Sequence, residues 1–118
     1  MNFAQAISSG FRNYVTFSGR ASRSEYWYWV LFAIIGSIVT AILDRAVFAD
    51  SDYSPLNAVF GLLLLLPGLA VSVRRLHDIG RTGWWLLIGL TGIGLIVLIV
   101  WYCQKSDPAP NAYGPPPA

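Results

Sequence analysis

The chain alternates between short charged segments and long apolar ones. Three stretches of 18, 21 and 23 residues carry no charged side chain, and they cover residues 26–43, 53–73 and 82–104. A helix needs about 20 mostly apolar residues to cross a hydrocarbon core of about 30 Å. The pattern therefore predicts an all-α integral membrane protein with three transmembrane helices. We place these spans at about residues 26–43, 55–73 and 83–103 of a single membrane domain that covers residues 1–104.

The N-terminal 25 residues follow a helical pattern of a different kind. Phe3, Ile7, Phe11 and Tyr14 recur every three or four residues, with polar residues between them. This stripe predicts an amphipathic helix. Two placements suit it equally, because the membrane interface and the protein's own spans both select a one-sided apolar face. The segment lacks an apolar core and contains three arginines, so we expect no cleavable signal peptide.

Small residues mark the first span and the start of the second. Ala33, Ser37 and Ala41 recur every four residues. This spacing predicts a face for close packing against another span, either of this chain or of a second copy. Ser54 and Pro55 have the order of an N-cap and a first helical residue, so we expect the second span to begin there.

The third span contains Gly89, Thr91, Gly92 and Gly94. These residues leave open whether the span is one continuous helix or is broken between Gly89 and Gly94. A broken segment would give legs of about 14 Å, too short to cross, so we expect one crossing helix. The glycines do not indicate a nucleotide site, because neither a preceding strand nor a following lysine accompanies them.

Residues 105–118 form a proline-rich tail. Five of the seven prolines of the chain lie in it. Such a composition predicts a flexible, disordered C-terminal segment without a packed core.

Charge predicts the orientation of the spans. Charged residues make up 12% of the chain, about half the share of a typical soluble domain. Residues 1–25 and 74–81 each carry three arginines against one acidic residue, whereas residues 44–52 and 105–118 together carry two basic and four acidic residues. With three crossings, the positive-inside rule places the N-terminus in the cytoplasm and the C-terminus outside.

Tryptophans near the ends of the spans agree with this topology. Tryptophan favours the membrane–water interface because its ring is apolar and its N–H stays hydrated. The expected interface anchors are Trp27, Trp29, Trp84, Trp85 and Trp101.

Several classes of chemistry are disfavoured by the residues present. One cysteine and one histidine supply neither a disulfide nor a zinc site of the usual spacing, so we expect no metal and no cofactor. The arginines flank apolar spans and do not form a basic face interleaved with aromatic residues, which disfavours a nucleic-acid partner. His77 and Asp78 are adjacent, but no activated nucleophile accompanies them, so we expect no enzyme.

The predicted topology gathers a charged cluster at the cytoplasmic interface. Its basic members are Arg20, Arg23, Arg74, Arg75, His77 and Arg81. The favoured interpretation is structural: Glu25 and Asp78 form ion pairs that clamp the two cytoplasmic segments together. A second interpretation is a binding site for an anionic lipid or an acidic protein segment. Catalysis by His77 and Asp78 is the weakest of the three.

Three blocks of the sequence carry a resemblance. They are FSGRASRSEYWYW (Phe17 to Trp29), RRLHDIGRTGWWLLI (Arg74 to Ile88) and NAYGPPP (Asn111 to Pro117). In this order they resemble the domain of unknown function 805 family of small bacterial inner-membrane proteins, from about Tyr14 to Pro117. In such a membrane, an external C-terminus would lie in the periplasm. The chain departs from the family pattern at Ala112, where a basic residue is common. The resemblance implies an inner-membrane location and transfers no catalytic or ligand residue.

The functional hypothesis follows from location more than from chemistry. We expect a non-enzymatic inner-membrane component whose arginine-rich cytoplasmic face binds anionic lipid or a partner protein. The alternative is a small transporter or channel-like homo-oligomer whose pathway is lined by Gly89, Thr91 and Gly92, since three spans alone leave little room for a pore.

Overall fold

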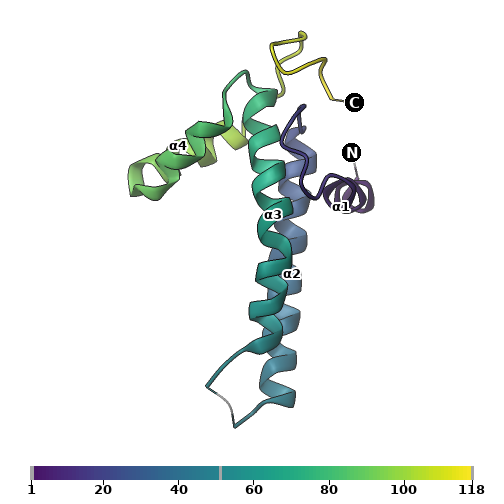
Figure 1. The fold of residues 1–118 in the computed structure, drawn as a ribbon, viewed down its shortest axis with the longest axis vertical. Helices are drawn as coiled ribbons and strands as arrows, with labels where there is room; N and C mark the ends of the chain where they lie inside the picture. The colour runs from purple at the N-terminus through teal and green to yellow at the C-terminus, as the bar shows by residue number, and fades with distance from the viewer. Residues whose placement is uncertain (1, 51, 118) are drawn as a thin grey trace.

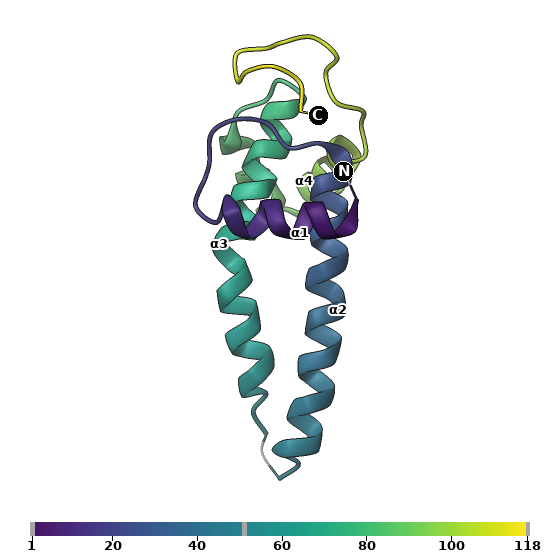
Figure 2. The same cartoon turned by 90° about the vertical axis from the view of Figure 1, so that its right-hand side faces the viewer.

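The computed structural model describes residues 2–50 and 52–117, and the regular elements of this part of the chain are all helices. In chain order they are α1 (Phe3–Arg12), α2 (Arg23–Val47), α3 (Pro55–Asp78), η1 (Gly83–Leu90) and α4 (Gly92–Tyr102). The predicted all-α class is confirmed. Helices α2 and α3 run side by side as a long hairpin, while α1 and the η1–α4 pair lie across it on opposite sides, near one end (Figures 1 and 2).

The α2–α3 hairpin has the dimensions of a membrane-spanning pair. Its helices contain 25 and 24 residues, and at 1.5 Å per residue each exceeds the hydrocarbon thickness of about 30 Å. Their most apolar windows have a mean hydropathy of 2.0 and 2.2, and most side chains in them face outward. Two of the three predicted spans therefore exist as helices long and apolar enough to cross a membrane.

The third predicted span differs from the structure. Residues 83–103 form an eight-residue 3₁₀-helix, η1, and an eleven-residue α-helix, α4, which fold back on each other. The side-chain oxygen Oγ1 of Thr91 accepts a hydrogen bond from Gly94 N at 2.9 Å and caps α4. A Cβ at Gly94 would lie 1.7 Å from the carbonyl oxygen of Ile88, so this tight return requires glycine. Hydropathy registers the apolar length of the segment but not this break.

The η1–α4 pair, which we call the arm, brings the chain back to the end from which it left. Helix α4 is only about 16 Å long, too short to cross the hydrocarbon. Both ends of the described chain consequently lie at the same end of the α2–α3 hairpin (Figures 1 and 2). The expectation of termini on opposite sides of the membrane depended on a third crossing helix, and residues 83–103 do not form one.

Helix α1 packs on the protein's own helices through its small residues. Asn2 caps the helix, since its Oδ1 accepts from Gln5 N at 2.8 Å. The buried face consists of Ala6, Ser9 and Gly10, and a Cβ at Gly10 would lie 2.2 Å from the ring of Trp29. The apolar stripe predicted from the sequence flanks this face, and α1 lies across α2 because glycine allows the indole to approach its backbone.

Trp29 is a core residue and not the interface anchor that its position suggested. Its side chain is 3% exposed and packs with Ala21, Leu64 and Val71. The ring of Phe11 meets it edge-on at 5.3 Å between centroids. Trp29 is buried because α1 covers this part of α2. The sequence alone does not reveal that packing.

At the opposite end of the hairpin, α2 caps the start of α3. Ser54 occupies the N-cap position but makes no side-chain cap bond. Instead, the two carboxylate oxygens of Asp44 accept from Leu56 N and Asn57 N, both at 2.9 Å. A carboxylate at a helix N-terminus satisfies unpaired N–H groups and complements the helix dipole. Asp44 is buried in this role and fixes how α2 and α3 meet.

The glycine contact between α1 and α2 predicts a stability difference. Gly10→Ala places a methyl group into the Trp29 ring and should lower the free energy of unfolding by about 1–3 kcal/mol, the usual cost of overpacking. Gly61→Ala is the matched control, because a Cβ at Gly61 meets no atom within 4 Å. Thermal unfolding in detergent measures both variants. Equal melting temperatures would contradict the packing of α1 on Trp29.

Candidate functional site

The charged side chains gather where both ends of the chain meet α3. This end of the hairpin contains the loop from α1 to α2, the C-terminal turn of α3 and the tail, and we call it the polar end (Figure 2). Seven of the eight lysine and arginine residues lie on its side of the spans, the exception being Arg45. The predicted site residues on α2, α3 and their flanking loops are thus brought close together.

Asp78 lies at the centre of the polar end and binds two arginines. Its Oδ1 is 3.0 Å from Arg20 Nε, and its Oδ2 is 2.6 Å from Arg75 Nη1. All three side chains are at most 1% exposed. Such pairing is strong where the dielectric constant is low, but forming it costs the desolvation of each charge. Removal of one partner would leave the other charge buried without compensation.

Arg20 also holds the tail. Its Nη1 donates to the main-chain oxygens of Ala109 and Gly114 at 3.0 and 3.1 Å, and its Nη2 donates to that of Asp107 at 2.6 Å. Gly114 has a φ of +122°, a conformation that side chains other than glycine's rarely adopt. The guanidinium thus joins the α1–α2 loop, the end of α3 and three points along the tail.

His77 contributes a second attachment of the tail. The ring of Tyr113 stacks on the imidazole at 4.0 Å between centroids with an angle of 1° between planes. The Nδ2 of Asn111 donates to the main-chain oxygen of His77 at 2.9 Å, while His77 Nδ1 lies 2.9 Å from the oxygen of Gly19. The tail therefore docks on the polar end, in contrast to the flexible segment that its prolines predicted.

A second buried ion pair joins three helices. Glu25 accepts from Arg74 Nη1 at 2.9 Å and from Ser9 Oγ at 2.6 Å. Because these residues belong to α2, α3 and α1, the carboxylate fixes the position of α1 against the hairpin. The Nε and Nη2 atoms of Arg74 are buried without a hydrogen-bond partner among the described residues. Ser9 was missed by the sequence reasoning, although its i+3 spacing from Ala6 marks the same small face.

The remaining candidate residues donate hydrogen bonds to the end of α4, which we call the base of the arm. Arg75 Nε and Nη2 and Trp27 Nε1 donate to the carbonyl oxygen of Tyr102, at 3.4, 3.3 and 3.0 Å. Arg23 Nη1 donates to the next carbonyl, that of Cys103, at 3.1 Å. These donors satisfy oxygens that the end of α4 leaves without helical partners. Burial raises the pKa of the Tyr102 phenol.

Tryptophans surround the same base. The guanidinium of Arg81 lies 3.9 Å above the ring of Trp101, a cation–π contact, and Trp85 meets that ring edge-on at 5.5 Å. Trp84 is 77% exposed on the arm. Of the five predicted interface anchors, Trp84 and Trp85 are the most exposed, whereas Trp27 and Trp101 are partly buried and Trp29 belongs to the core.

Gly89, Thr91 and Gly92 occupy the turn of the arm. They lie where η1 passes into α4, away from the α2–α3 hairpin (Figure 1). This position gives no support to a pathway lined by these residues within one copy of the chain.

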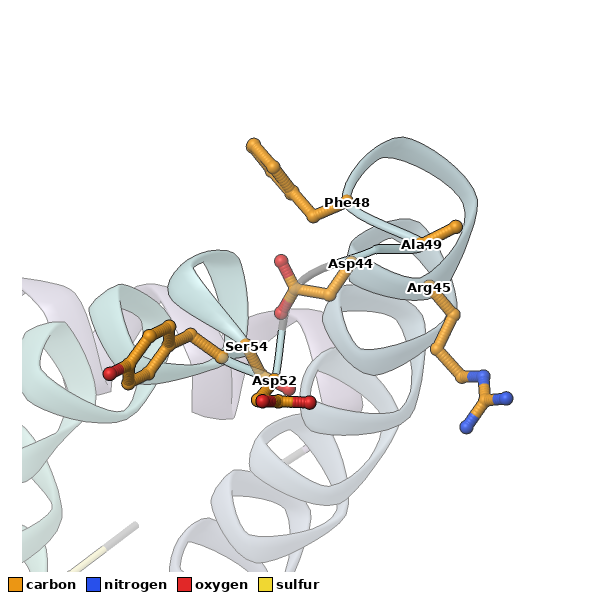
Figure 3. Close-up of a pocket in the computed structure, with 7 residues that line it drawn as sticks. Asp44, Arg45, Phe48, Ala49, Asp52 and Ser54 are labelled. Carbon is orange, nitrogen blue, oxygen red and sulfur yellow. The ribbon is translucent and has the colours of Figure 1, made fainter.

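A cavity of about 280 Å³ lies at the opposite end of the hairpin, beneath the link between α2 and α3. Asp44, Arg45, Asp52 and Tyr53 are among the residues that line it, and Figure 3 shows the Arg45 side chain extending in a different direction from the Asp44 carboxylate. Both Asp44 oxygens already accept main-chain N–H groups. Within the described residues no group of three or more His, Cys, Asp or Glu side chains could hold a metal ion.

Comparison with known proteins matches residues 14–115 to the model of a protein family of unknown function, DUF805. The chain belongs to this family. It is 41% identical over 109 residues to the inner membrane protein YhaH of Escherichia coli K12, covering 90% of each chain. It is also 41% identical over 108 residues to the inner membrane protein YhaI of the same strain, covering 90% of this chain and 89% of the relative. No solved structure matches.

The shared carboxylate predicts a large loss of stability. Asp78→Asn leaves two buried guanidinium groups without a counter-charge and should cost about 3–5 kcal/mol. Asp107→Asn is the matched control, because the Asp107 side chain accepts only from Ala109 N among the contacts at the polar end. Thermal unfolding in detergent distinguishes them. Two equally stable variants would show that Asp78 does not hold the polar end together.

Proposed function

We propose that this protein is a non-enzymatic, two-span inner-membrane protein whose polar end faces the cytoplasm and binds anionic lipid headgroups. One observation carries the proposal: the basic residues concentrate at the polar end, and several of them stay exposed there after the internal ion pairs have formed.

The distribution of charge supports this orientation. With two crossings, the side of the spans that holds the polar end carries seven basic residues, whereas the link of residues 44–52 carries one arginine and three aspartates. The positive-inside rule counts lysine and arginine near the ends of spans, so it favours cytoplasmic placement of both ends of the chain. This assignment uses the fold in place of the three-span topology expected from hydropathy.

Among the exposed basic residues on this side of the spans, only Arg23 belongs to the cluster predicted from the sequence. Arg20, Arg74 and Arg75 are engaged in buried ion pairs. Arg12, Arg23 and Lys105 are exposed. Each lysine or arginine near an anionic leaflet contributes about 1 kcal/mol to binding. These three side chains therefore suit anionic headgroups, whereas the buried arginines serve the fold.

A shallow hollow beside Arg23 supports a specific headgroup contact. It has a volume of about 260 Å³ and is lined by Arg23, Ser24, Trp27 and Tyr28. Arginine binds phosphate in a bidentate fork, and neighbouring aromatic rings suit the depth of the headgroups. The hollow thus combines a cation with interface-seeking rings at the polar end.

The arm supports placement in the leaflet next to the polar end. It exposes large apolar side chains along both of its helices, among them Leu87, Leu90, Ile93 and Ile96. Because η1 and α4 lack a polar face, water and the headgroup layer do not suit them, unlike an amphipathic interfacial helix. The arm begins and ends at the polar end. Its apolar surface is therefore best accommodated among the lipid tails of the leaflet next to that end.

Topology is testable by thiol labelling. In a Cys103→Ser background, Ala112→Cys and Ser8→Cys should react with a membrane-impermeant maleimide only after the inner membrane is opened, because both lie on the side of the spans that holds the polar end. Asp50→Cys in the link should react in intact spheroplasts. Labelling of Ala112→Cys from outside would contradict the two-span assignment.

Lipid binding is testable by charge reversal. Arg23→Glu with Lys105→Glu should reduce the enrichment of phosphatidylglycerol over phosphatidylcholine around the protein in mixed nanodiscs by at least about tenfold, since two attractive charges become repulsive. Arg45→Glu reverses an exposed charge at the opposite end and should leave the enrichment unchanged. Mass spectrometry of retained lipids measures both. Unchanged enrichment in the double variant would refute the lipid proposal.

A further inference from the structure

Arg20 has a donor edge that only the tail occupies among the described residues. Its Nε contacts Asp78 Oδ1 at 3.0 Å, and its Nη2 contacts the Asp78 main-chain oxygen at 3.1 Å. The remaining bonds of Nη1 and Nη2 go to Asp107, Ala109 and Gly114. Three main-chain oxygens from one short segment thus converge on the outer edge of a buried guanidinium.

The charge balance around Arg20 favours an anion at this edge. Arg20 and Arg75 share the single carboxylate of Asp78, so the buried cluster carries one net positive charge. The tail contributes carbonyl dipoles, while the Asp107 carboxylate accepts from Ala109 N instead of reaching Arg20. A buried charge is stabilised more by a counter-charge than by neutral acceptors. A ligand with anionic oxygens would therefore satisfy the cluster better than the tail does.

The tail can leave without dismantling the helices. Apart from its bonds with Arg20, the tail contacts the other described residues through the Tyr113 stack on His77, the Asn111 bond to the His77 oxygen and a bond from Asp107 N to the Asp78 oxygen at 3.2 Å. The helices are joined by separate contacts, including the Glu25–Arg74 pair. Release of the tail therefore breaks its three hydrogen bonds with Arg20, its two contacts with His77 and the bond from Asp107 N, and leaves the contacts between the helices in place.

We propose that Arg20 is a latent phosphate-binding site, which the tail covers by presenting three main-chain oxygens in place of phosphate oxygens. Release of residues 107–117 uncovers the Nη1–Nη2 edge, the fork that binds phosphate in bidentate fashion. The phosphate belongs to an anionic lipid headgroup or to a solute. This inference deepens the proposed function by adding a covered, switchable site to the exposed cations of the same end.

The first measurement follows the tail in an otherwise unaltered site. A spin label at Ala112→Cys, in the Cys103→Ser full-length chain, reports tail mobility in phosphatidylcholine nanodiscs. Added phosphatidylglycerol should convert the label from an immobilised to a mobile state, and phosphatidylcholine alone should not. If inorganic phosphate also mobilises the label, the site accepts a soluble source; if it does not, the lipid is the ligand. A label that stays immobilised in both titrations overturns the proposal.

The second measurement loosens the tail. Asn111→Ala with Tyr113→Ala removes both attachments to His77 and leaves Arg20 in place. This variant should bind phosphatidylglycerol or phosphate at least about tenfold more tightly than the parent, because the competing tail is weakened. Adding Arg20→Lys keeps the charge but removes the fork, and should abolish the gain, whereas adding Arg45→Lys should not.

A gain that survives Arg20→Lys in a variant with an unchanged melting temperature overturns the proposal. If that variant does not fold, the spin-label titration decides alone. The outcome is separable from the proposed function: loss of lipid enrichment in the Arg23 and Lys105 double variant tests the exposed cations, whereas the Arg20-dependent response of the tail tests the covered site.

Discussion

The polar end depends on one carboxylate that two buried guanidinium groups share. Asp78 ends α3, Arg75 precedes it by one turn, and Arg20 arrives from the loop before α2. The remaining donors of the two arginines bind the carbonyl oxygens of the tail and of the end of α4. The packing of the two long helices does not by itself position the loop before α2, the tail and the end of α4 relative to one another. The cluster joins them, because each buried N–H must find an acceptor where water is scarce.

The need to pair buried N–H groups also divides the arginines into two groups: those whose side chains hold the fold together and those that stay exposed. An arginine-rich end beside a membrane suggests headgroup binding, yet the side chains of Arg20, Arg74 and Arg75 are buried and paired, and Arg81 stacks on Trp101. On our proposal, lipid recognition therefore falls to the exposed side chains around them, and access to Arg20 depends on the tail. Buried ion pairs of this kind give specificity of arrangement more than net stability, since desolvation offsets much of their attraction.

Sequence reasoning succeeded where a property is additive along the chain. The helical class, the two long spans and the N-terminal amphipathic helix follow from apolar length and period, and the family blocks predicted membership of DUF805. It failed at residues 83–103, where a threonine cap and Gly94 turn the chain back within an uninterrupted apolar stretch. Trp29 and the tail were misjudged for a related reason: both are held by partners distant in sequence.

The sequence by itself determined that hydrocarbon solvates most of this chain, because transfer free energy depends on composition and length, and both are written locally. It also determined that basic residues flank the spans. Only the tertiary structure decided that residues 83–103 are not one long helix, which arginine side chains are buried and that the tail docks. Those outcomes depend on whether one backbone can approach another, as at Gly10 and Gly94, and on which carbonyl lies within reach of which guanidinium. Such contacts connect residues up to 94 positions apart, so no local pattern encodes them.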